Sequence, residues 1–279
     1  MKRNERLRMI YPVFMTVLTY LPILIVVVWS FNESKLSSVW SGLSFKWYRE
    51  LFSDRSMLTA LGTSLFLGAA SSVIAAVIAI SAALSMDRAR LPFLGVIEKI
   101  MLTPMIIPEI VLGMVFLAYF SLLHLPFGIL TLLIAHVAFS IPYIYMEVRA
   151  ALSQLDPQVT EAARDLGAGP VTAFFTVTLP MLSPAIVSGM FLSFAMSFDD
   201  VIISIFVTGV SVNTLPIKVY TQLKTGLSPK INALCSLMLS VTLLCSLAAF
   251  LIRRRTAKKR GITEDSEKVK QNERNGIPS

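Results

Sequence analysis

Long apolar stretches separated by short polar segments run through most of the chain. An α-helix needs about 20 apolar residues to cross a bilayer core of about 30 Å. Six stretches come close to this length, namely residues 10–31, 61–85, 100–122, 128–148, 182–204 and 232–252. The pattern therefore predicts an all-α polytopic membrane protein with six transmembrane helices and both termini on the same side of the membrane.

Composition agrees with this interpretation. Of the 279 residues, 55% are hydrophobic and only 15% are charged, and the mean hydropathy is +0.71. Such a chain is too apolar for a water-soluble domain, and we expect one bundle that includes residues 61–252. The apolar run to Phe31 is longer than the core of a cleaved signal peptide and has no small-residue cleavage site, which favours a retained first helix.

The positive charges predict the orientation. Eighteen of the 25 lysines and arginines lie in the N-terminal segment 1–9, the second and fourth loops, and the tail 253–279. Since cytoplasmic loops are enriched in positive charge, both termini are expected in the cytoplasm, although the fifth loop carries three lysines against this trend. The net charge of +8 then reflects topology, and nucleic-acid binding is not expected. In the outer loop 32–60, aromatic residues that lie close together are typical of a membrane interface; they are Trp40, Phe45, Trp47 and Tyr48.

Several helices carry residues with a structural or functional signature. Small residues at a spacing of four in the second stretch predict close helix packing; they are Gly68, Ser72, Ala76, Ala75, Ala79 and Ala83. Glu109 directly follows Pro108. Its carboxylate either stabilises the first turn of a helix or contacts the substrate, and the sequence leaves both interpretations open. His136 is predicted to be a buried hydrogen-bonding residue. With two histidines and two cysteines, no metal site is expected.

A polar insertion, residues 150–181, interrupts the apolar pattern between the fourth and fifth stretches. Asp156-Pro157 predicts a helix start and Gly167 predicts its end. Within this helix the apolar residues at i, i+3, i+4 and i+7 form a stripe, namely Val159, Ala162, Ala163 and Leu166, while Glu161 and Asp165 share another face. A second short helix is expected over 170–178. The insertion either rests on its own bundle or docks to a soluble partner.

The spacing within this insertion resembles a known family. The EAA loop has the pattern E-A-A-x3-G-x9-I-x-L-P. The insertion matches it with Glu161-Ala162-Ala163, then Gly167 after three more residues, and after nine more residues VTLP at 177–180, where Val replaces Ile. This loop is found in inner-membrane permease subunits of binding-protein-dependent ABC importers. The resemblance implies a type I importer fold in which Glu161, Ala162, Ala163 and Gly167 couple to an ATP-binding subunit.

We expect ATP to be bound and hydrolysed by a separate chain. The sequence has no Gly-Lys pair, hence no G-x-x-x-x-G-K-[ST] phosphate loop, and no paired nucleophile and base that would indicate an enzyme. We therefore expect no catalytic residues and no cofactor in this chain, with ATP bound by the partner subunit.

A pair of carboxylates near the end of the fifth stretch indicates the kind of substrate that is transported. Asp199 and Asp200 follow Phe191, Phe194 and Phe198, and carboxylates at membrane depth normally face water, a cavity or a partner. Acidic and aromatic side chains suit a cationic amine. A solvated helix end is the alternative interpretation, and the sequence does not decide which Asp lines a pathway.

Residues 30–34, 39–48, 197–209 and 214–234 resemble the second permease subunit of spermidine/putrescine importers. The resemblance implies a bacterial inner-membrane heterodimer of two permeases, two ATP-binding subunits and a periplasmic or lipid-anchored substrate-binding protein. It also implies polyamine as the substrate. An ABC permease for another small solute, and an ion-driven secondary transporter, are the alternatives.

Overall fold

The structure, a computed structural model, describes residues 2–35, 39–88, 93–226 and 229–244. The chain forms two compact units, one from residues 54–225 and the other from residues 1–53 together with residues 226–279. The predicted basic tail 253–279, the end of the sixth stretch and Cys245 lie outside the described residues.

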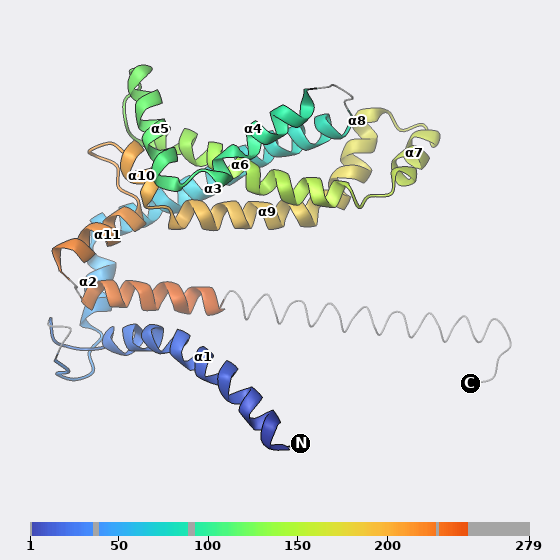
Figure 1. Cartoon of the computed structure of the whole chain (residues 1–279). Coiled ribbons are helices and arrows are strands. Elements are labelled where there is room, and N and C mark those ends of the chain that lie inside the picture. Colours follow the sequence, from blue (N-terminus) through green and yellow to red (C-terminus); the bar gives the residue numbers. More distant parts are fainter. Residues whose placement is uncertain (1, 36–38, 89–92, 227–228, 245–279) are drawn as a thin grey trace. The chain divides into compact units, whose positions relative to one another are not determined.

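Unit 54–225 is built around three long helices that pack on one another, α3 (Arg55–Arg88), α6 (Ile129–Leu152) and α9 (Leu179–Asp199) (Figure 1). The remaining elements of this unit are α4 (Leu94–Ile106), α5 (Glu109–Leu122), α7 (Pro157–Asp165), α8 (Pro170–Ala173), a π-helical turn η1 (Phe174–Thr178), α10 (Ile202–Val207) and α11 (Leu215–Thr225). All assigned elements of the described chain are helical, as the hydropathy pattern predicts.

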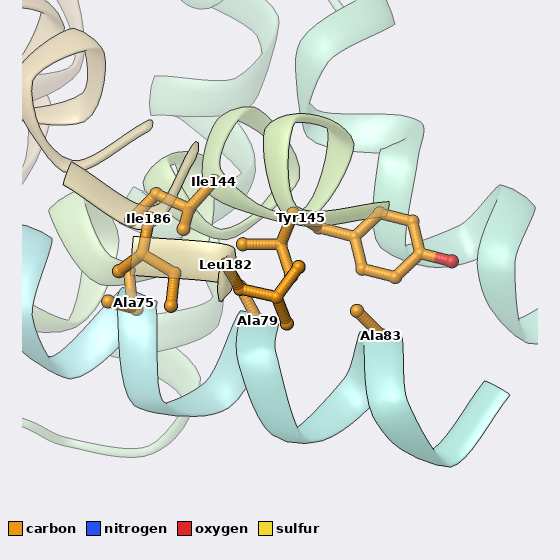
Figure 2. Packing of buried hydrophobic residues seen from close by; sticks show 9 residues of the cluster. Ala75, Ala79, Ala83, Ile144, Tyr145, Leu182 and Ile186 are labelled. Atoms are coloured by element: carbon orange, nitrogen blue, oxygen red, sulfur yellow. The ribbon is translucent and has the colours of Figure 1, made fainter. Parts of the chain in front are cut away.

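Small side chains on α3 allow this close packing. Ala75, Ala79 and Ala83 have no exposed surface, and they lie against Leu182 of α9 and Tyr145 of α6 (Figure 2). Because lipid tails are as apolar as the core, such helices gain stability from close contact and dispersion rather than from removal of water. The predicted packing role of α3 is confirmed.

A glycine on α9 makes the contact with α6 closer still. A Cβ atom at Gly189 would lie 3.0 Å from the Cα of Ile144, which is tighter than normal packing allows. The hydrogen in place of a side chain therefore sets the distance between the two helices.

The third apolar stretch differs from the single helix predicted over 100–122. It forms α4 and α5, which meet at an angle of 110°. Proline at 108 has no N–H and disfavours a helical conformation at the residue before it; Ile107 accordingly has an extended ψ of 134°. Pro104, by contrast, lies inside α4 without ending it.

The fifth stretch also differs from its predicted bounds. The short helix expected over 170–178 is not separate, because α8, η1 and α9 form one apolar run, Pro170–Asp199. The helix predicted to reach residue 204 instead ends at Asp199, and α10 begins at Ile202 after a break at Asp200.

Four helices in the described residues are long and apolar enough to cross a membrane, and α4 with α5 would make a fifth if the bent pair is one span. The sixth predicted stretch is represented by a shorter apolar helix, Pro229–Leu244. Membrane character is thus evident in the structure, while the count of six spans is matched only in part by the described chain.

The other unit contains α1 (Lys2–Trp29), α2 (Lys46–Ser53) and the helix Pro229–Leu244. In this unit the Tyr48 hydroxyl lies 2.7 Å from Ser30 Oγ and 3.2 Å from Ser236 Oγ. Trp47 is 3% exposed and donates from Nε1 to the carbonyl of Asn32 at 2.6 Å. Trp47 is therefore a core residue, whereas Trp40 and Phe45 are exposed.

Candidate functional site

The polar insertion forms the helix that its capping residues predict. The Asp156 side chain accepts a hydrogen bond from the Gln158 N–H at 2.9 Å, and Pro157 occupies the first helical turn of α7. Gly167 has φ 88°, a left-handed conformation that favours glycine, and the N–H of Ala168 donates to the carbonyl of Ala163 at 3.1 Å. These caps satisfy backbone groups at both ends of a nine-residue helix.

The apolar stripe of α7 is not covered by the unit that carries it. Leu166 is 90% exposed and Val159 is 41% exposed, and Glu161 and Ala162 are exposed as well. The exposed stripe favours the docking interpretation of the insertion over a loop that rests on its own bundle.

The base of the insertion is fixed to the bundle. Arg149, near the end of α6, donates to Asp87 of α3 at 2.9 Å. At the other end, η1 leads without a break into α9. The insertion is thus joined to α6 on one side and to α9 on the other.

The two adjacent aspartates have different environments. Asp199 is exposed, whereas Asp200 is only 9% exposed. Asp200 Oδ1 accepts from the Ile203 N–H at 3.1 Å, and Oδ2 accepts from the Ser204 N–H at 2.8 Å and the Ser204 hydroxyl at 2.6 Å. The solvated-helix-end interpretation is therefore wrong for Asp200, whose side chain caps the first turn of α10.

Asp200 keeps capacity for one more donor. An ionised carboxylate offers about four acceptor positions, of which the three hydrogen bonds just described use three. In the described chain the one basic side chain within 4 Å of it is His136, whose Nε2 lies 3.6 Å from Oδ2.

Asp200 and Glu109 of α5 both line one small cavity. Its wall also includes Phe139 and Tyr143 of α6, and its volume is about 20 Å³. Glu109 makes no salt bridge with a lysine or arginine in the part of the chain that the structure describes. The lining residues are completed by Pro104, Leu112, Met196 and Ile203. The cavity thus has two carboxylates and two aromatic rings around a space of about one water molecule.

The sequence identified part of this arrangement. Glu109 and Asp200 were both candidates, but nothing in the local sequence pairs them, because α5 and α10 meet only in the folded unit. Gly113 allows this contact, since a Cβ atom there would lie 2.5 Å from the Phe206 ring. Phe194, expected near the carboxylates, instead packs against Gly68.

The aromatic residues at the cavity were not identified from the sequence. Phe139 and Tyr143 are four residues apart and therefore lie on one face of α6. That spacing is the available signal, but it is equally typical of an ordinary core helix.

Comparison with known proteins agrees with this architecture. Residues 75–260 match the family described as the inner membrane component of binding-protein-dependent transport systems. The fold is similar to that of a bacterial ABC transporter involved in the import of the acidic polysaccharide alginate, with a TM-score of 0.68 at 14% identity over 91% of this chain and 96% of that chain. The chain belongs to this family of permease subunits, which are transport components rather than enzymes.

Two relatives within this family are similar to the chain in sequence over most of its length. The putrescine transport system permease protein PotI of Escherichia coli is 38% identical over 86% of this chain and 88% of its own length. The spermidine/putrescine transport system permease protein PotC of Escherichia coli is 36% identical over 86% of this chain and 90% of its own length.

Proposed function

We propose that this chain forms half of the translocation pathway of an ATP-driven importer of polyamines. The observation that carries the proposal is the cavity lined by both Glu109 and Asp200, neither of which pairs with a lysine or arginine in the part of the chain that the structure describes. A carboxylate at membrane depth is costly unless it faces water, a cavity or a partner, and a cationic substrate would compensate the charge of both side chains. The names of PotI and PotC, permeases of putrescine and spermidine/putrescine transport systems, support the same cargo.

The cavity suits one end of such a substrate. An alkylammonium group donates three hydrogen bonds, and Asp200 retains one acceptor position for it. The rings of Phe139 and Tyr143 offer faces for cation–π contact with the amine. A cavity of about 20 Å³ accommodates the ammonium head group but not a whole polyamine. The cavity walls must therefore separate for the substrate to pass. The bend between α4 and α5, next to Glu109, is a suitable place for that motion.

ATP hydrolysis drives this motion from a separate subunit. In the proposed assembly Glu161, Ala162, Ala163 and Gly167 belong to the surface that docks into the ATP-binding subunit, which also binds the ATP. The exposed stripe of α7 supports docking, because Leu166 is 90% exposed. The small side chains of Ala162 and Ala163 permit a close approach, and the left-handed turn at Gly167 directs the chain back toward α9.

The proposed setting is the bacterial cytoplasmic membrane, with segment 1–9, the coupling loop 150–181 and the tail 253–279 in the cytoplasm and loop 32–60 outside. A second permease completes the pathway as a heterodimer, and a periplasmic or lipid-anchored binding protein delivers the polyamine. This arrangement follows the charge distribution of the loops and the family to which the chain belongs.

The substrate can be tested at the binding protein. The complex is purified with its native ATP-binding subunit and binding protein, and the binding protein is screened by calorimetry against putrescine, spermidine, amino acids and sugars. We expect saturable binding of a polyamine and no binding of neutral sugars. Selective binding of a neutral or anionic solute would contradict the polyamine proposal and leave the permease class unaffected.

A further inference from the structure

A buried chain of polar side chains joins four helices and ends at Asp200. Ser71 Oγ of α3 lies 3.3 Å from Ser197 Oγ of α9, which lies 2.7 Å from His136 Nδ1 of α6. On the other side of the ring, His136 Nε2 lies 3.0 Å from Ser204 Oγ of α10. Ser71, His136 and Ser204 have no exposed surface and Ser197 is 4% exposed. The predicted role of His136 as a buried hydrogen-bonding residue is confirmed.

The carboxylate determines the direction of every hydrogen bond in this chain. An ionised carboxylate only accepts, so the Ser204 hydroxyl donates to Asp200 Oδ2. The Ser204 oxygen then accepts from His136 Nε2–H, and in a neutral ring Nδ1 accepts from the Ser197 hydroxyl. Ser71 completes the chain when it donates to Ser197 at 3.3 Å rather than to the carbonyl of Gly68, also at 3.3 Å. From Ser197 onward each donor points toward Asp200 and stabilises its negative charge.

These serines differ from most hydroxyl residues in the same helices. Ser81 of α3 and Ser183 of α9 donate to carbonyls four and three residues earlier in their own helices, the usual solution in an apolar setting. Ser197 and Ser204 instead bond to side chains of other residues, and within the described part of the chain His136 links the two. A packing role alone could be met by an apolar side chain, without the cost of burying polar groups.

We propose that His136 is a positioning residue for the substrate-binding carboxylate. It holds Ser204, and through Ser204 it holds Asp200 at the break between α9 and α10, so that the remaining acceptor position of Asp200 faces the cavity shared with Glu109. This inference rests on the proposed transport of a cationic substrate. It adds a residue that does not line the cavity itself.

Two substitutions separate positioning from packing. In His136→Gln the side-chain amide reaches the position of Nε2 and can still donate to Ser204. In His136→Asn the amide reaches only the position of Nδ1, so the bond to Ser204 is lost while a polar group stays near Ser197. We expect Gln to keep polyamine uptake within about twofold of the parent and Asn to lower it about tenfold, as for loss of one buried hydrogen bond.

A double-mutant cycle with Asp200→Asn provides the second readout. If His136 acts through Asp200, adding His136→Asn to Asp200→Asn lowers uptake no further, whereas independent effects would multiply. Ser204→Ala, which breaks the same link with little change in volume, replaces His136→Asn in the cycle if that variant does not assemble. His124→Asn is the matched control, because His124 is exposed and has φ 54°, where asparagine is tolerated.

Uptake is measured with the complete complex in proteoliposomes, normalised to the amount of assembled complex. Equal uptake by the Gln and Asn variants, or multiplied effects in the cycle, would overturn the positioning role and leave the proposed function intact. Absence of polyamine uptake by the unmodified complex would overturn the proposed function, and with it this inference. The result we expect is uptake by the parent, rescue by Gln and a non-multiplicative cycle.

Discussion

At the scale of single residues, burial separates two side chains that are identical and adjacent in the sequence. Asp199 is exposed, while Asp200 is buried, bonded to the first turn of α10 and located in the cavity with Glu109. The change in backbone direction at the end of α9 produces this difference. The pair therefore does not act as one acidic patch, and Asp200 is the member that we place in the pathway.

Asparagine substitutions test this assignment. In Asp200→Asn one side-chain oxygen remains to cap α10, because asparagine is a good capping residue, but the negative charge is lost. We expect polyamine uptake to fall about tenfold, as for loss of a hydrogen bond to a charged group, with normal yield of the complex. Asp199→Asn is the matched control and should stay within about twofold of the parent. Normal uptake by the Asp200 variant would make its carboxylate purely structural.

At the scale of elements, α7 is a short helix whose ends are fixed and whose apolar stripe is exposed. The Asp156 cap and the turn at Gly167 define its length, and the attachments at α6 and α9 connect it to the bundle. Its own contacts are too few for a nine-residue helix to be stable in isolation. A partner that covers Leu166 would stabilise α7 and receive or transmit its displacement.

Charge reversal on α7 tests the coupling role. Glu161→Lys should reduce co-purification of the ATP-binding subunit and lower transport by about tenfold or more, because a repulsive charge at an interface weakens docking. Membrane insertion of the chain should be unchanged. Asp165→Lys, on the same face one turn later, shows whether the effect belongs to Glu161 or to the face as a whole. Unchanged assembly and uptake in the Glu161 variant would contradict the coupling role.

Close packing of α9 on α6 is a second property at this scale. Gly189→Leu would force a side chain into the backbone of Ile144, and overpacking of this kind costs about 1–3 kcal/mol. We expect a lower thermal transition of the purified complex. Gly62→Ala is the control, since a Cβ atom there meets no other atom within 4 Å, and it should leave the transition unchanged or raise it. An unchanged transition for the Gly189 variant would show that the two helices separate at little cost.

At the scale of the whole molecule, hydropathy and capping signals predicted the helical class, the packing role of α3 and the bounds of α7. These features depend on residues close together in sequence. The 110° bend of the third stretch and the end of α9 at Asp199 do not show in the hydropathy pattern, because apolar residues continue on both sides of Pro108 and after Asp200. The cavity was missed because Glu109 and Asp200 come to line it only through the packing of α5 on α10, with Gly113 against Phe206.

The central claim, that this chain forms part of an ATP-driven path for polyamines, is tested most directly by uptake of labelled spermidine and putrescine. The complex is reconstituted in proteoliposomes with ATP inside and the loaded binding protein outside. We predict accumulation that requires internal ATP, persists in the presence of an uncoupler, and is lost when Glu109→Gln and Asp200→Asn are combined. Uptake that continues without ATP, collapses with the uncoupler or is unaffected by the combined substitutions would contradict the claim.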